Sequence, residues 1–225
     1  REPNTSVLAL QALLEDFTAL HSDLAKQFSV TLIAGTFPVV VTGSTAVNRA
    51  MIFDKRGLVG YQDKLMLTRY EKEQWCISGG EDIAVFDTDA GKIGISICYD
   101  SEFPLIARKQ AEAGVKVLVV PSCTETASGF SRVRIGSQAR ALENQIYVIH
   151  SPLVGDAPWA PAVARNKGRA SIYGPAAHGF SDTGILEEAT HDREGWLFGK
   201  LSMNALQKVR QQGAVSNFSD WKNQP

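Results

Sequence analysis

The sequence predicts an α/β fold with two sheets whose outer faces are covered by helices. Hydrophobic residues recur at helical spacing over 6–28 and predict a long amphipathic helix, with Thr5 or Ser6 as its N-cap. Further along, antiparallel hairpins and strand–helix–strand units share one chain, with no linker, internal repeat or break in composition between them. Residues 1–225 are therefore expected to form a single domain.

The remaining elements follow from apolar runs that are bounded by glycine, proline and polar turns. Strands are expected at 30–34, 37–41, 46–53, 58–63, 83–87, 92–98, 115–120, 146–151, 170–173, 184–188 and 195–201. Helices are expected at 104–113, 131–145 and 204–212. Loops are expected at 64–80, with one helical turn, and at 155–168, and a polar tail at 216–225.

Composition excludes several classes of function. The 225 residues carry a net charge of -1, so neither a nucleic acid nor a membrane surface is expected as a partner. No apolar run reaches the roughly 20 residues that span a bilayer. Three cysteines without paired spacing indicate a reducing, cytoplasmic location. No zinc-binding spacing or phosphate-binding glycine loop occurs, so no metal and no cofactor is expected.

The most informative segment surrounds Cys98. An apolar strand that includes Ile93 runs into this cysteine, a polar turn follows, and Pro104 begins a helix. Backbone N–H groups at such a turn can hold a thiol as thiolate and can also receive an oxyanion. On this segment alone, a buried structural cysteine explains the pattern equally well.

Two further segments decide between these interpretations. One runs from Tyr61 to Glu71 and contains Lys64, and the other is the 134–145 stretch RIGSQARALENQ. Taken in order with the cysteine segment, VPS at 120–122 and SIYGP at 171–175, they resemble the nitrilase superfamily, the carbon–nitrogen hydrolases. The resemblance extends over about residues 5–220 and implies a four-layer α-β-β-α sandwich.

The resemblance also implies roles for individual residues. Cys98 matches the family's nucleophile, Lys64 its catalytic lysine and Glu71 an auxiliary glutamate, for which Glu73 is a weaker candidate. A free thiol is only a few per cent thiolate at neutral pH, so a positive neighbour helps it. Without the shared spacing, Lys64 and Glu71 would each be interpreted as exposed surface residues.

Two departures from the family pattern stand out. The general-base glutamate of the family normally follows an apolar strand upstream of the first long helix, and this chain shows no such segment. Glu2 is the nearest candidate, but we expect instead that the base precedes Arg1 and that the catalytic domain is incomplete. The second departure is Glu102, where many members carry arginine.

The function expected from these residues is hydrolysis of a small amide through a Cys98 thioester, with release of ammonia or an amine. A nitrilase acting on a C≡N bond, and an inactive relative that only binds a ligand, remain open. A cysteine–histidine pair with His150 or His178 is a third alternative, although no spacing favours it.

Three residues in the predicted loops and turns are candidates for contact with the small-molecule amide or nitrile substrate: Tyr99, Glu125 and Trp159. The resemblance further implies a homodimer or larger assembly. Its interface would combine the helix after Cys98 with the helix over 134–143, which presents Ile135 among its charges.

Overall fold

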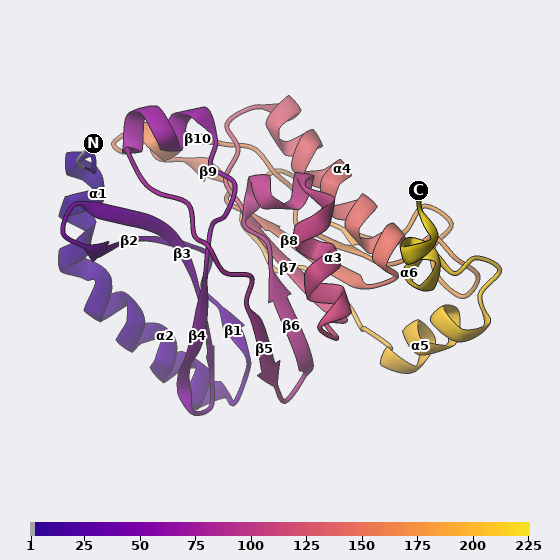
Figure 1. Cartoon of the computed structure of the whole chain (residues 1–225). Helices are drawn as coiled ribbons and strands as arrows, with labels where there is room; N and C mark the ends of the chain where they lie inside the picture. The colour runs from indigo at the N-terminus through magenta and orange to yellow at the C-terminus, as the bar shows by residue number, and fades with distance from the viewer. Residues whose placement is uncertain (1–2) are drawn as a thin grey trace.

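A computed structural model describes residues 3–225 (Figure 1). Its helices are α1 (Thr5–Leu10), α2 (Leu14–Phe28), α3 (Pro104–Glu112), α4 (Ala127–Asn144), α5 (Met203–Gln212) and α6 (Asn217–Asp220). Its strands are β1 (Leu32–Ile33), β2 (Phe37–Thr42), β3 (Thr45–Asp54), β4 (Gly57–Asp63), β5 (Val85–Thr88), β6 (Gly91–Ile95), β7 (Val117–Ser122), β8 (Tyr147–Pro152), β9 (Gly155–Asp156), β10 (Arg165–Asn166), β11 (Ser171–Tyr173) and β12 (Ile185–Glu188). Short helical turns span Gln11–Leu13, Glu71–Trp75, Cys98–Glu102, Pro161–Val163 and Trp221–Asn223.

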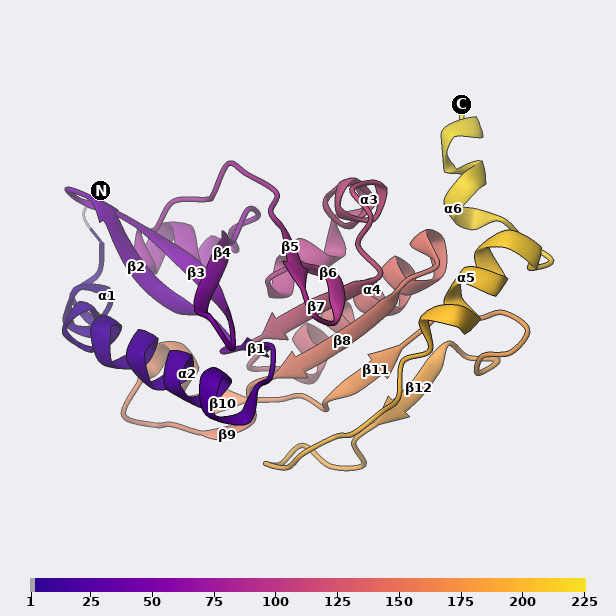
Figure 2. The same ribbon diagram turned by 90° about the horizontal axis from the view of Figure 1, so that it is seen from below.

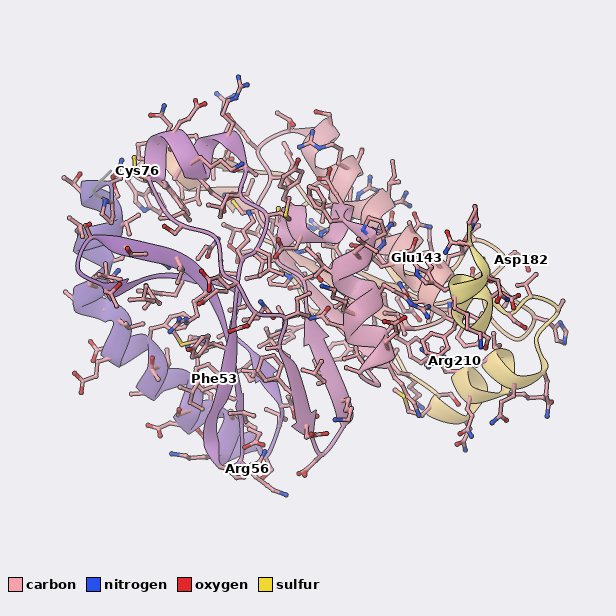
Figure 3. The ribbon with its side chains drawn as sticks, viewed as in Figure 1. Phe53, Arg56, Cys76, Glu143, Asp182 and Arg210 are labelled. Atoms are coloured by element: carbon pink, nitrogen blue, oxygen red, sulfur yellow. The ribbon has the colours of Figure 1, made fainter. Side chains whose placement is uncertain are left out.

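The first sheet is antiparallel and is organised around β3. Within residues 3–225, β1 and β2 pair along one edge of β3 and β4 pairs along the other, so that Ile52 lies between Ile33 and Gly60. The β3–β4 turn is closed by Arg56, labelled in Figure 3, whose guanidinium and backbone N–H bond the Asp54 carboxylate. Helix α2 lies along the outer face of this sheet.

The second sheet has the order β12-β11-β8-β7-β6-β5 within the described residues. Its centre is parallel, because β6 pairs with β7 and β7 with β8, and the outer strands are antiparallel. Parallel neighbours need crossover connections, and α3 and α4 provide them. Both helices pack on the same face of this sheet (Figure 2).

Three clusters of buried side chains mark the contacts between four layers. Ala25 and Phe53, the latter labelled in Figure 3, belong to a cluster between α2 and the first sheet. Ile52 and Ile95 belong to a second cluster, between the two sheets. Ala107 is in the third, which packs α3 and α4 on the second sheet. The order of layers is α-β-β-α, so the fold expected from the sequence is confirmed.

Two elements predicted from the sequence differ in the structure, the first helix and the strand at 195–201. The first helix begins after Asn4, whose side chain accepts the Ser6 N–H at 2.8 Å, and a tight turn over Gln11–Leu13 divides it. Residues 195–201 have no backbone hydrogen bond to another described segment, so the strand expected there does not form.

The tail is also more ordered than the sequence predicts. Helix α6 and the turn after it place the rings of Phe218 and Trp221 4.8 Å and 5.0 Å from the buried guanidinium of Arg108, which also donates to the Phe218 carbonyl. Cation–aromatic contacts of this kind hold a polar-looking segment on the surface. None of the helices within residues 3–225 combines the length and the apolarity needed to cross a bilayer.

Candidate functional site

Cys98 lies just beyond the end of β6, where the chain leaves the second sheet. The strand ends at Ile95, so the prediction that it reaches Cys98 is too long by three residues. Cys98 is the first residue of the turn Cys98–Glu102 and has a φ of 51°, in the left-handed region that a residue with a side chain seldom adopts. Such a conformation persists only where surrounding contacts impose it.

Asp100 supplies several of those contacts. Its buried carboxylate accepts the Ile97 N–H at 3.1 Å, the Met66 N–H at 2.7 Å and the Leu65 N–H at 3.2 Å. Burial raises the pKa of Asp100 to about 6, although these backbone donors and the charge of Lys64 act in the opposite direction. The carboxylate therefore joins the cysteine turn to the segment that follows Lys64.

Lys64 forms a buried ion pair with Glu71. The ammonium nitrogen lies 2.7 Å from both carboxylate oxygens, and the two residues are only 3% and 5% exposed. The Glu71 carboxylate also accepts the Thr68 backbone N–H and hydroxyl, each at 2.8 Å, and the amide of Asn48 at 3.4 Å. The expectation that Lys64 lies within salt-bridge reach of Glu71 is confirmed.

These side chains share one cavity of about 790 Å³. Cys98, Lys64 and Glu71 line it together, although Lys64 lies 34 positions before the cysteine in the sequence. Glu125, one of the predicted substrate contacts, lines the same cavity, as does Arg165. The cavity thus brings a thiol, a fixed cation and mostly apolar walls into one space that can hold a small molecule.

Burial disfavours ionisation of the Cys98 thiol. Burial raises its pKa above the ordinary value, and this effect exceeds the opposing charge of Lys64, which Glu71 partly cancels. Burial therefore opposes the thiolate form that the backbone donors of the turn and the charge of Lys64 favour. The sulfur donates to the Cys123 carbonyl at 3.8 Å, and within residues 3–225 no carboxylate hydrogen-bonds it. Glu2, considered as a base, lies outside the described residues.

Two predicted substrate contacts lie elsewhere. Tyr99 faces a separate open hollow of about 510 Å³, beside the ion pair of Glu102 with Arg132. Trp159 is 81% exposed and does not line the cavity that contains Cys98, because its loop projects the ring into solvent. Glu73 also lies apart from Lys64, since it pairs with Arg69 at 3.6 Å on the surface.

The histidines do not form a base for the cysteine. His178 is exposed, and the buried ring of His150 is occupied by the Ser122 hydroxyl, 2.8 Å from Nε2. The residues that sequence reasoning missed are Asp100 and Cys123. An acidic residue two positions after the cysteine was the available signal for the first, and no signal marked the second.

His150 is expected to make the fold sensitive to acid. Burial lowers the pKa of His150 from 6.5 to about 4. Between these two values the unfolded chain binds a proton at His150 and the native state does not. Stability present above pH 6.5 is thus lost as the pH falls, by about 2–3 kcal/mol at pH 4.5. Urea unfolding of the wild type and His150→Gln across this range measures the effect.

Asp100 shifts stability in the other direction. Its native pKa of about 6 is above the unfolded value of 3.8, so protonation below pH 6 favours the native state and offsets part of the His150 effect. Asp100→Asn should therefore lose more stability between pH 7 and pH 4.5 than the wild type does. For the preceding prediction, parallel profiles of unfolding free energy against pH in the wild type and His150→Gln would contradict the role given to His150.

Comparison with known proteins places this geometry in context. Residues 2–211 match the family model described as carbon–nitrogen hydrolase. The chain is 38% identical over 220 residues to a probable hydrolase, YhcX, of Bacillus subtilis. The match covers 98% of this chain and 43% of that protein. It is 31% identical over 158 residues to the omega-amidase NIT3 of Saccharomyces cerevisiae, and this match covers 66% of this chain and 50% of that protein.

The fold is similar to a solved structure as well. The crystal structure of yeast Nit3, a member of branch 10 of the nitrilase superfamily, superposes with a TM-score of 0.75 at 26% identity. The match covers 87% of this chain and 68% of that one. The chain spans about half the length of the two curated relatives, so similarity to them extends only to that part.

Proposed function

The chain belongs to the carbon–nitrogen hydrolase family, a family of amidase-type enzymes, and from this premise we propose that it hydrolyses a small amide with Cys98 as the nucleophile. The observation that carries the proposal is the shared cavity, in which the Cys98 thiol lies with the buried Lys64–Glu71 pair. A surface lysine would not need a bidentate carboxylate at 2.7 Å, whereas a catalytic cation must keep one position.

The proposed reaction proceeds in two steps. First, the Cys98 sulfur bonds to the amide carbon, the C–N bond breaks, and the proton of the thiol ends on the leaving nitrogen, which departs as ammonia or an amine. Second, water attacks the thioester carbon and the C–S bond breaks. The acid is released, and the thiol recovers its proton from the attacking water.

Lys64 has two roles in this scheme. Its charge lowers the pKa of Cys98 against the effect of burial, and it can stabilise the oxyanion that develops on the amide oxygen. Within residues 3–225 Glu71 makes no hydrogen bond to the sulfur; it fixes the ammonium group with two hydrogen bonds. Loss of one oxyanion-stabilising group typically lowers the rate by about 10²–10³.

The test is ammonia release from a panel of small primary amides and the matching nitriles, assayed with the protein at pH 7–9. We expect release from at least one amide and a rate that rises with pH, because burial raises the pKa of the Cys98 thiol. Turnover of nitriles alone would transfer the assignment to a nitrilase. No turnover of any compound would contradict the proposal.

We also propose that two copies of the chain associate through α3 and α4. Leu105 on α3 and Ile135 on α4 are 64% and 63% exposed, and both helices cover the same face of the second sheet. Exposed apolar side chains on adjacent helices are typical of self-association surfaces. Sedimentation at micromolar concentration is expected to give the mass of a dimer or larger assembly, and Leu105→Glu with Ile135→Glu should shift it to the monomer.

A further inference from the structure

Asp100 makes the only hydrogen bonds that join the two catalytic segments, 64–71 and 97–102, within the described part of the chain. Its side chain lies between the backbone of Leu65 and Met66 on one side and that of Ile97 on the other. Asp100 is 1% exposed and does not line the catalytic cavity, so it does not touch a molecule bound there. It therefore has contact with the catalytic machinery but not with the substrate.

The opposite side of the cysteine turn is held by different contacts. Arg140 on α4 donates to the Ser101 carbonyl at 3.3 Å, and a Cβ placed on Gly136 would lie 2.9 Å from the same oxygen. These contacts fix the turn against α4 but leave its distance from Lys64 undetermined. Among the hydrogen bonds of the described residues, only those of the Asp100 carboxylate join the turn to the segment that follows Lys64.

Burial of the charged Asp100 side chain is energetically unfavourable. A carboxylate in this position is destabilised by burial, and its backbone donors do not fully compensate, as its raised pKa shows. Asparagine has nearly the same shape and would remove the charge. Because its amide nitrogen is a donor, however, it cannot accept from Ile97 and from the lysine segment together.

We propose that Asp100 is a positioning residue, which holds the Cys98 turn against the Lys64 segment so that the lysine's charge acts on the sulfur. This inference rests on the proposed function, in which Lys64 assists Cys98. It assigns Asp100 no contact with substrate and no step in the reaction. Its effect must therefore disappear when Lys64 carries no charge.

The test is a double-mutant cycle on the pH dependence of Cys98 alkylation by iodoacetamide, followed by peptide mass spectrometry to separate it from Cys76 and Cys123. Asp100→Asn is expected to raise the apparent pKa of Cys98 and to lower the alkylation rate at pH 8 about three- to tenfold. The direction is informative, because removal of a nearby negative charge would by itself favour the thiolate and lower this pKa.

The second arm uses the background Lys64→Met with Glu71→Gln, which removes the ion pair without leaving one charge buried alone. There, Asp100→Asn should leave the apparent pKa of Cys98 unchanged or lower it. If Asp100→Asn raised the apparent pKa of Cys98 equally in both backgrounds, its role would be merely structural and the proposal would be overturned. The absence of a rise in this pKa in the wild-type background would also overturn it. Asp87→Asn, a change of an exposed carboxylate paired with Lys92, is the charge-matched control and should alter neither profile.

Folding of each variant is checked by thermal unfolding. If Asp100→Asn does not fold, the cycle is run with Asp100→Glu, which keeps the charge and both acceptors but moves them by one methylene; the same coupling to Lys64 is expected. Alkylation needs no turnover, so the two proposals fail separately. If no ammonia is released but the effect of Asp100→Asn depends on Lys64 as expected, only the amidase assignment is rejected. If ammonia is released but this dependence is absent, only the role of Asp100 is rejected.

Discussion

Cys98→Ala is expected to abolish ammonia release, with a rate at least about 10³ below that of the wild type, while the chain keeps its fold. The sulfur is the only heavy atom removed, and Cys98 packs at the border of two hydrophobic clusters without filling either alone. The unfolding free energy should fall by no more than about 1–2 kcal/mol. Ammonia assays and urea unfolding of the same preparation measure both quantities.

The neighbouring thiol cannot replace the lost one. Cys123 also lines the cavity, but its Sγ hydrogen-bonds the Asn166 side chain at 3.1 Å, and its pKa is raised to about 11, chiefly by burial, which the substitution leaves in place. Almost none of it is thiolate at pH 8. Residual activity above a tenth of the wild-type rate in Cys98→Ala would mean that Cys98 is not the nucleophile.

Cys76 provides a matched control for this experiment. It is a free thiol with nearly the same backbone conformation, with a φ of 54° against 51° for Cys98. It lies at the end of the turn Glu71–Trp75 and does not line the catalytic cavity; Figure 3 labels it. Cys76→Ala should therefore show the same loss of stability from alanine in the left-handed region as Cys98→Ala does. It should nevertheless retain full activity.

The layers of the fold could be predicted from periodicity, and the ends of the chain could not. Strands such as β2 and β3 are apolar runs bounded by turn residues, and α3 begins at its proline, so these elements match their predicted ranges closely. Residues 195–201 also contain an apolar run but find no strand to pair with among residues 3–225. An apolar run shows that a segment can be buried in a sheet, whereas pairing depends on a neighbouring strand that the local sequence does not show.

The site divides in the same way. The shared spacing identified Cys98, Lys64 and Glu71, and the structure gathers all three at one cavity. The substrate contacts rested on loop position alone, and of these only Glu125 lines the cavity, since loops project side chains in directions that no periodicity fixes. The raised pKa of Cys98 depends on burial in three dimensions, so a turn motif could not reveal it.

Lys64→Met is expected to lower the unfolding free energy by about 3–5 kcal/mol at pH 7. The cost comes less from the lost attraction than from Glu71, whose carboxylate would stay buried without a counter-charge. Thr68 and Asn48 continue to donate to that carboxylate, which favours the lower end of the range. Urea unfolding gives the value directly.

Adding Glu71→Gln to Lys64→Met should restore most of this loss, because the buried pair is then replaced by neutral groups of similar volume. Activity should not return, since the cation that assists Cys98 is still absent. The exposed pair Lys55–Asp89 is the control: its side chains also lie 2.7 Å apart but are 55% and 76% exposed, so Lys55→Met should cost less than about 1 kcal/mol. If Lys64→Met costs no more than Lys55→Met, the pair is not buried in solution. If instead the double variant recovers both stability and turnover, Lys64 serves the fold and not the reaction.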